Sequence, residues 1–235
     1  MLRSILTVAA VLAAQTTRAD EPQSAKSKAR VVSTQTREVK KPPLRAADSD
    51  APLPEGWPAA TEPGKIEVKA YPAYRSAVAR AQNARLNADN ALFFPLFLHI
   101  SRKNVAMTAP VVNTYTPQML EKPGAEGDMS MEFLYSSTKQ GELGAGVGAV
   151  RVEDHPAATF ACLGFVGAMN DDVMRDGVRD LRAWLDEHMS EWTADGPPRR
   201  LGYHGPMTPE AERRWEVQLP VKPAKQIEEK PASRK

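Results

Sequence analysis

The chain has 235 residues, of which 31 are basic and 29 acidic, and it contains one cysteine. This near-neutral balance argues against a nucleic-acid-binding protein, which normally carries a basic excess or stripe. The lone Cys162 excludes an intrachain disulfide, so a packed core must stabilise the fold.

Residues 1–19 have the three parts of a cleavable signal peptide. Arg3 is followed by the small, apolar run Ile5–Ala14, and Thr17–Ala19 places small residues at the cleavage site. The run is shorter than the roughly 20 residues that cross a bilayer. We therefore expect a mature chain without a membrane span, located in the periplasm or secreted. Loss of Arg3 and Arg18 leaves 29 basic and 29 acidic residues, a net charge of zero.

Both ends of the mature chain differ in composition from its middle. Residues 20–63 are rich in Lys, Ser, Thr, Ala and Pro, with few large apolar side chains, which predicts a disordered linker. Residues 222–235 predict a disordered tail for the same reason. A single ordered domain is expected over residues 64–221.

A weak internal repeat relates the two parts of this domain. Ile66–Ala73 aligns with Val150–Ala157 at an offset of 84 residues; both alternate apolar and polar residues and reach a ring before Pro-Ala. Further strand candidates follow at Arg75–Ala79 and Thr159–Val166.

The first predicted helix follows Asp89 or Asn90, either of which can cap it. Its apolar residues are Leu92, Phe93, Leu96, Phe97 and Ile100. Pro95 removes a hydrogen bond inside a helix, so the sequence predicts either a kink or a helix that starts at Phe94.

The second predicted helix follows Asn170 or Asp171 and is ended by Gly196-Pro197. Its apolar stripe, at spacings of three and four, comprises Met174, Val178, Leu181, Leu185, His188 and Trp192. On this stripe, His188 is expected to be packed and hydrogen-bonded rather than a ligand.

Two further strand candidates follow each helix. They are Ala109–Thr116 and Met129–Tyr135 in the first half, and Arg200–His204 and Trp215–Leu219 in the second. The order predicts an α+β fold of two β-β-α-β-β halves, with antiparallel strands and helices on one face. The glycine-rich segment 140–149 lacks the helix start of a dinucleotide site and predicts a linker.

Three segments resemble a known family. Asn104–Val111, with Met107–Val111 as its most specific part, resembles the signature of the SOUL haem-binding family. Lys65–Tyr71 followed by a proline resembles the start of that family, and Tyr203–Val217 resembles its end. The resemblance covers residues 64–221. It implies two pseudo-symmetric halves that form a distorted antiparallel barrel flanked by two helices, and a tetrapyrrole ligand beside the first helix.

A haem site needs an apolar wall, cations for the propionates and, optionally, an iron ligand. His99 is the candidate metal ligand, because imidazole is a common axial ligand. The full set of candidate haem-binding residues is Phe93, Phe94, Phe97, Leu98, His99, Arg102, Lys103 and Met107. The alternatives are core packing for the aromatic rings and a solvated turn for the two cations. His155 and His204 are expected to be exposed.

No catalytic motif is present, so we expect a non-enzymatic protein that holds haem or a related porphyrin in an apolar groove. Cys162 is expected to be a buried strand residue, and Glu132, Asp154 and Glu216 to face solvent. A binding module for another small molecule or a peptide, and a tetrapyrrole-modifying enzyme, are the alternatives. The oligomeric state is not indicated.

Overall fold

A computed structural model describes residues 49–86 and 88–224 of the chain. The predicted signal peptide at 1–19, the linker as far as residue 48 and the tail from residue 225 lie outside the described residues. Within the described ranges, no helix is long and apolar enough to cross a membrane.

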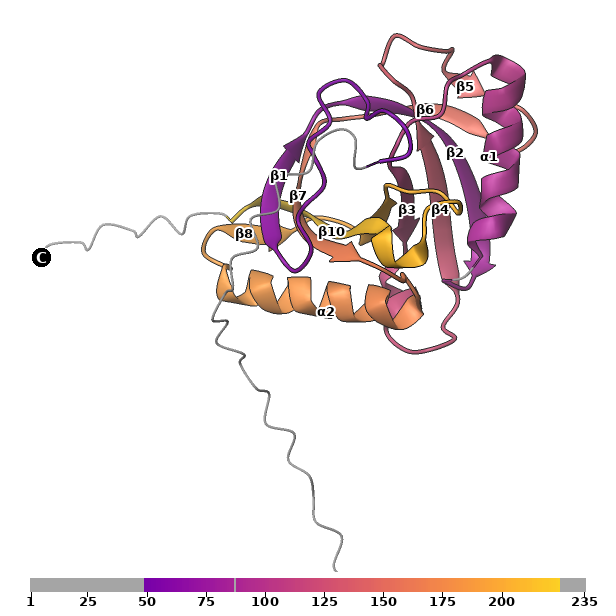
Figure 1. Ribbon diagram of the computed structural model, residues 1–235. Coiled ribbons are helices and arrows are strands. Elements are labelled where there is room, and N and C mark those ends of the chain that lie inside the picture. Colours follow the sequence, from indigo (N-terminus) through magenta and orange to yellow (C-terminus); the bar gives the residue numbers. More distant parts are fainter. Residues whose placement is uncertain (1–48, 87, 225–235) are drawn as a thin grey trace, which may run out of the picture. The chain divides into compact units, whose positions relative to one another are not determined.

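Ten strands form one antiparallel sheet (Figure 1). They are β1 (Ile66–Tyr71), β2 (Tyr74–Ala84), β3 (Val111–Tyr115), β4 (Gly127–Leu134), β5 (Gly144–Ala145), β6 (Arg151–His155), β7 (Ala158–Val166), β8 (Trp192–Ala194), β9 (Arg199–Gly202) and β10 (Arg214–Pro223). The strand order is β1-β7-β10-β9-β3-β4-β2-β6-β5, and β8 pairs with β10. The α+β class is therefore confirmed. The sheet is not closed, because β1 and β5 are its free ends, so the barrel is not confirmed.

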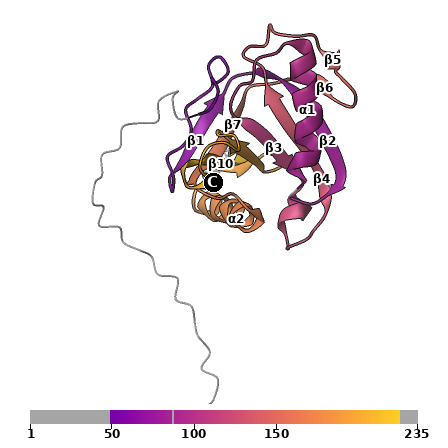
Figure 2. The same cartoon turned by 45° about the vertical axis from the view of Figure 1, so that its right-hand side comes forward.

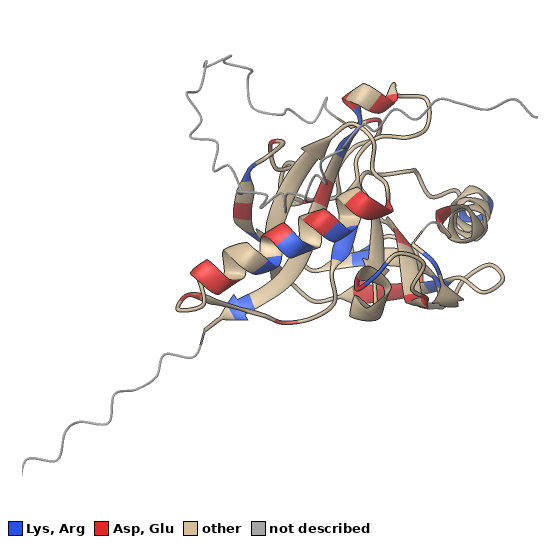
Figure 3. Cartoon of the chain, turned by 90° about the horizontal axis from the view of Figure 1, so that it is seen from below, with Lys and Arg blue, Asp and Glu red and all other residues tan. Residues whose placement is uncertain are grey.

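Two helices, α1 (Asp89–Lys103) and α2 (Asp171–Glu187), cover separate parts of the sheet. Helix α1 contacts β2 and β4, whereas α2 contacts β7, β8 and β10. Figures 1 and 2 show α1 along one side of the sheet and α2 below it. Both helices pack their buried side chains into a single apolar cluster with the sheet. Acidic and basic residues alternate along the outer face of α2 (Figure 3).

Helix α1 begins at Asp89 and continues through Pro95, so the predicted start at Phe94 is wrong. Its buried face comprises Leu92, Leu96, His99 and Ile100, at helical spacing. Pro95 is half-buried, and the carbonyl group that its missing N–H would bind belongs to exposed Ala91. Water can solvate that carbonyl, which explains why the helix tolerates the proline.

Helix α2 forms as the sequence predicts, but it is shorter. The Asn170 side chain caps its start by accepting a hydrogen bond from the Val173 N–H at 2.9 Å. Gly177 faces the sheet, where a Cβ atom would lie 3.0 Å from Phe165 and Val217. The helix ends at Glu187, so Trp192, although in step with the apolar stripe, lies in β8 and pairs with β10.

The other face of the sheet carries a second apolar cluster, which residues 49–63 cover. Trp57 is 6% exposed and meets Tyr71 and Tyr74 edge to face, at ring-centroid distances of 4.8 and 5.2 Å. This part of the expected disordered linker is therefore packed. We name residues 49–63 the N-terminal strap.

Candidate functional site

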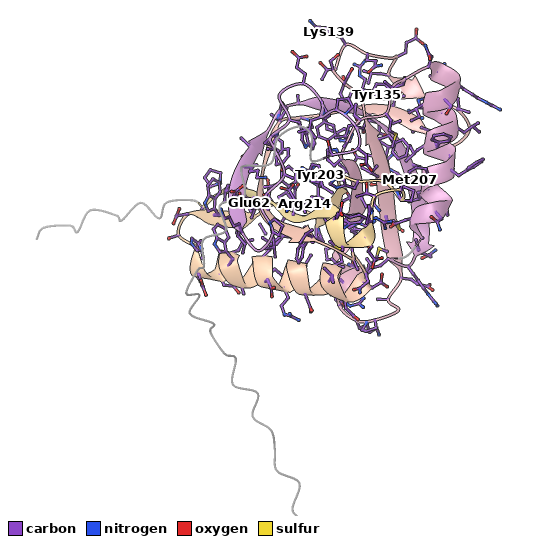
Figure 4. All side chains as sticks on the ribbon, viewed as in Figure 1. Glu62, Tyr135, Lys139, Tyr203, Met207 and Arg214 are labelled. Atoms are coloured by element: carbon purple, nitrogen blue, oxygen red, sulfur yellow. The ribbon has the colours of Figure 1, made fainter. Side chains whose placement is uncertain are left out.

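A groove of about 460 Å³ lies between α1, the helix side of β3 and β9, and the loop that follows β9. We name it the α1 groove. Its size lies in the range of roughly 300–1,000 Å³ that is usual for small-molecule sites. In Figure 4, Tyr203 and Met207 mark the loop that borders it.

The wall of the α1 groove is apolar and aromatic. Phe93 and Phe97 line it from α1 with stacked rings whose centroids lie 6.2 Å apart, and Phe93 also meets Phe133 edge to face at 5.1 Å. The lining also includes Met107, Val111, Met131 and Trp215. Phe93 and Phe97 remain 38% and 49% exposed, so covering them with an apolar ligand would be favourable.

One end of the groove is polar. Arg200 of β9 donates from Nη2 to Asp89 Oδ2 at 2.5 Å, and Asn113 of β3 donates from Nδ2 to Asp89 Oδ1 at 2.7 Å. Burial acts to lower the pKa of Arg200, but the neighbouring Tyr115 and Asp89 outweigh it and raise that pKa. Arg200 is therefore a permanent cation inside a largely apolar groove.

The strap and the loop after β9 form the rim of the groove. Asp50 accepts hydrogen bonds from the Gly205 N–H at 2.6 Å and from the Thr208 hydroxyl at 2.9 Å. The Gly205 hydrogen bond is the main reason that the pKa of Asp50 is lowered. Arg213 donates to the Thr208 and Pro206 carbonyl oxygens, both at 2.9 Å. These bonds fix the loop on the strap.

The structure brings together only part of the predicted site. Phe93, Phe97 and Met107 line the α1 groove. The other predicted residues, Phe94, Leu98, His99, Arg102 and Lys103, do not line it. Phe94 is 68% exposed. Arg102 and Lys103 are exposed, as the alternative of a solvated turn predicts, but they belong to the last turn of α1.

His99 points into the protein and has both ring nitrogens engaged. Its Nε2 lies 2.8 Å from the Tyr135 hydroxyl, and its Nδ1 accepts the Val147 N–H at 3.1 Å. Gly146 allows this close approach, because a Cβ atom there would lie 3.0 Å from the imidazole. Burial, and secondarily Lys103, lower the pKa of His99. The arrangement fits a neutral structural histidine and does not fit the predicted iron ligand.

His204, which does line the groove, also lacks a free lone pair for iron. Its Nδ1 accepts the Arg214 N–H at 3.0 Å, so the neutral ring carries its proton on Nε2. It lines the groove as a hydrogen-bond donor. The lining therefore fits the apolar ring and the acidic groups of haem, but among the described residues it contains no imidazole positioned to ligate the iron.

The other polar candidates have structural roles. Glu132 and Glu216 were expected to face solvent, but both are buried on the strap side of the sheet. Glu216 accepts hydrogen bonds from Lys69 at 2.7 Å, Tyr203 at 2.9 Å and the Thr61 N–H at 2.5 Å. Burial acts to raise the pKa of Glu216, but the charge of Lys69 and the hydrogen bonds from Lys69 and Thr61 outweigh it, so the pKa is lowered. No metal-binding group of His, Cys, Asp or Glu occurs among residues 49–86 and 88–224.

Two further predictions concern single side chains. Cys162 is buried, and burial raises its pKa to about 12, so the thiol is not activated as a nucleophile. His188 is packed on Trp184, with ring centroids 4.0 Å apart, and its Nδ1 lies 2.8 Å from the Trp184 carbonyl oxygen. Both expectations are confirmed.

Sequence reasoning missed several groove residues that lie far apart in the chain. Asp89, Asn113 and Arg200 come from α1, β3 and β9. The strand register pairs Asn113 with Arg200, and both donate to Asp89. Trp215 lies within Tyr203–Val217, the segment that resembles the end of the family, and this resemblance was the only indication in the sequence of a role at the site. Gly202 makes room for its ring, since a Cβ atom there would lie 2.7 Å from Trp215.

The sequence matches the family model described as SOUL heme-binding protein over residues 58–220. The chain belongs to the SOUL haem-binding family. The match begins inside the strap, before the domain start expected at residue 64. No curated protein matches the sequence.

Solved structures with a similar fold have low sequence identity. The EcmrR C-terminal domain is 18% identical, with a TM-score of 0.55 over 67% of this chain and 97% of that domain. An uncharacterized conserved protein from Listeria innocua is 10% identical, with a TM-score of 0.51 over 68% and 93% of the two chains. A hydrolase from the same organism is 9% identical, with a TM-score of 0.49 over 68% and 93%. For the first two structures, whose TM-scores are above 0.5, identities of 18% and 10% mean that the likeness concerns the fold alone.

Proposed function

We propose that this protein binds haem or a related tetrapyrrole in the α1 groove and does not act as an enzyme. The observation that carries the proposal is the exposed pair Phe93 and Phe97 on an apolar groove, in a chain of a haem-binding family. Met107, from the family motif, lines the same groove.

The groove residues have distinct tasks in this proposal. The phenyl rings and Met107 cover an apolar face of the macrocycle and exclude water from it. Arg213 and the strap hold the loop that borders the ring. Bound haem supplies the redox and absorption properties of its iron, and no protein imidazole in the groove is positioned to ligate it.

A visible-absorption titration of the mature chain with ferric haem tests this function. We expect a saturable one-to-one change in the Soret band, weakened at least tenfold by Phe97→Ala. Phe94→Ala is the matched control, because Phe94 lies on the same helix but outside the groove. The absence of a change in the folded wild-type protein would overturn the proposal and favour a different apolar ligand. Product accumulation with catalytic amounts of protein would favour a tetrapyrrole-modifying enzyme.

We also propose that the protein is exported and that residues 1–19 are removed. The apolar run and the small residues before Asp20 support this. The mass and N-terminal sequence of protein recovered from an expressing cell test it. A chain that begins at Asp20 in the exported fraction is expected, and retention of Met1 in the cytoplasm would contradict it.

We infer that the domain consists of two related halves. The element order β1-β2-α1-β3-β4 corresponds to β6-β7-α2-β9-β10. Apart from β5 and β8, which have no counterpart, the strand order of the sheet is unchanged when it is read in reverse and each strand is replaced by its counterpart. Glu132 and Glu216, both buried, are also 84 residues apart, the offset of the sequence repeat. The inference is consistent with the duplicated architecture that the family resemblance implies.

A further inference from the structure

Arg200 is held rigidly at the polar end of the α1 groove. It lies on β9 between β3 and β10, where it pairs with Asn113 and Val217. Its guanidinium carbon lies 5.4 Å from the Trp215 ring centroid and 5.8 Å from that of Tyr115. With Asp89 bound to Nη2, the orientation of the guanidinium group is set before any ligand arrives.

This guanidinium group still has donors that the protein does not use. Its only hydrogen bond within the described part of the chain runs from Nη2 to Asp89, so Nε and Nη1 have no protein acceptor there. Neither atom is among the fully buried side-chain nitrogens that lack a partner, so each keeps some exposed surface. The Arg200 side chain is 12% exposed and lines the groove.

Two carboxylates, Asp89 and Asp171, act on the charge of Arg200, and only Asp89 is bonded to it. Asp89 is its ion-pair partner, but that carboxylate also accepts a hydrogen bond from Asn113 and is 34% exposed to solvent. The cation is therefore more deeply buried than its counter-ion. A second carboxylate that entered the groove would find a charged donor in apolar surroundings, where such hydrogen bonds are strong.

The other cations near the groove are less suited to a ligand. Arg213 donates from Nε and Nη2 to carbonyl groups of its own loop. Arg102 and Lys103 do not line the groove.

We infer that Arg200 binds a carboxylate of the ligand, so that the α1 groove selects flat apolar molecules that carry an acid group. For a tetrapyrrole, this means that one propionate points inward to the polar end of the groove. The inference rests on the proposed function and specifies its ligand class and anchoring residue.

The test compares protoporphyrin IX with its dimethyl ester, because esterification removes the acid groups and keeps the ring. Fluorescence titration gives the ratio of the two affinities for each protein. The wild-type chain is expected to bind the free acid about tenfold more tightly than the ester, which corresponds to a difference of roughly 1.4 kcal/mol in binding free energy. Arg200→Gln is expected to lower this ratio to about twofold or less.

Further variants separate anchoring from folding. Arg200→Lys keeps a cation but lacks the planar guanidinium group with its fixed donors, so it is expected to retain part of the preference for the free acid. Asp89→Asn removes the counter-ion and is expected to raise the preference. Arg102→Gln, on α1 but outside the groove, is the matched control and should match the wild type.

Each result has one meaning. Equal wild-type affinities for acid and ester, within twofold, would overturn the role of Arg200 and leave tetrapyrrole binding intact. An acid-to-ester affinity ratio in folded Arg200→Gln equal to that of the wild type would also overturn the role of Arg200. Failure of the wild type to bind either compound would instead overturn the proposed function.

Discussion

At the scale of single residues, His99 shows that a residue type suited to ligating iron can have a purely structural role. Its position near the end of an aromatic helix, beside the expected groove, predicted an iron ligand. The helix instead directs it to the sheet side, where Tyr135 and Val147 engage its two nitrogens. The feature that decides its role is the approach of the glycine-rich segment 140–149 to α1. A sequence pattern contains no information about that approach.

Replacement of His99 by alanine should affect stability rather than the haem spectrum. The buried Tyr135 hydroxyl and the N–H of half-buried Val147 lose their hydrogen bonds, which costs on the order of 2–4 kcal/mol. Urea unfolding measures the loss, and the Soret position of the haem complex is expected to stay unchanged. A shifted Soret band in the folded variant would contradict the structural role.

The lowered pKa of His99 predicts a pH dependence of folding. The unfolded chain binds a proton near pH 6.5, whereas the folded chain resists protonation until a lower pH. The free energy of unfolding therefore increases as the pH rises toward 6.5, and it decreases as the pH falls below that value. Urea unfolding between pH 5 and 7 should show this slope, and His99→Gln should reduce it. An equal slope in both proteins would contradict the assignment.

At the scale of elements, local patterns predicted most strands and both helices. The alternation of apolar and polar residues in β1 and the apolar stripe of α2 were sufficient to predict these two elements. Each face of either element meets a single kind of surroundings, so the residue pattern follows the structure. The strap was missed because its composition is polar and its few apolar residues pack only against distant strands. Glu132 and Glu216 were misplaced for the same reason: the strap buries a sheet face that would otherwise be solvated. The α1 groove was half predicted, since Phe93, Phe97 and Met107 are near in sequence whereas Arg200 is distant.

The strap is expected to be part of the folding unit. Trp57→Ala removes a buried indole between Tyr71 and Tyr74 and should cost about 3–5 kcal/mol in unfolding free energy. Phe94→Ala, which changes an exposed ring, should cost much less. Denaturant unfolding distinguishes them, and equal midpoints would show that the strap does not contribute. A chain that starts at residue 64 should be less stable than one that starts at residue 49.

The Asn170 cap of α2 offers a second test at this scale. Asn170→Ala removes the side-chain acceptor of the Val173 N–H and should lower stability by about 1 kcal/mol. Asn170→Asp keeps an acceptor and should remain close to the wild type. Thermal unfolding of the three proteins measures the effect, and a full loss in Asn170→Asp would contradict capping.

At the scale of the whole molecule, ligand binding and stability are linked. A ligand that binds the folded chain at 100 times its dissociation constant adds about 2.7 kcal/mol to the unfolding free energy. Protoporphyrin IX should therefore raise the unfolding temperature of the wild type. The increase should be smaller for Phe97→Ala and unchanged for Phe94→Ala. An equal increase in all three would place the ligand outside the α1 groove.

The central claim is that a tetrapyrrole occupies the α1 groove, and methyl NMR of the methionines tests it most directly. Met107 and Met131 line the groove, whereas Met119 and Met174 are buried elsewhere and Met189 is exposed beyond the end of α2. On addition of metal-free protoporphyrin IX, we expect ring-current shifts confined to Met107 and Met131. Shifts at Met119, Met174 or Met189 with none at the groove methionines would contradict the account.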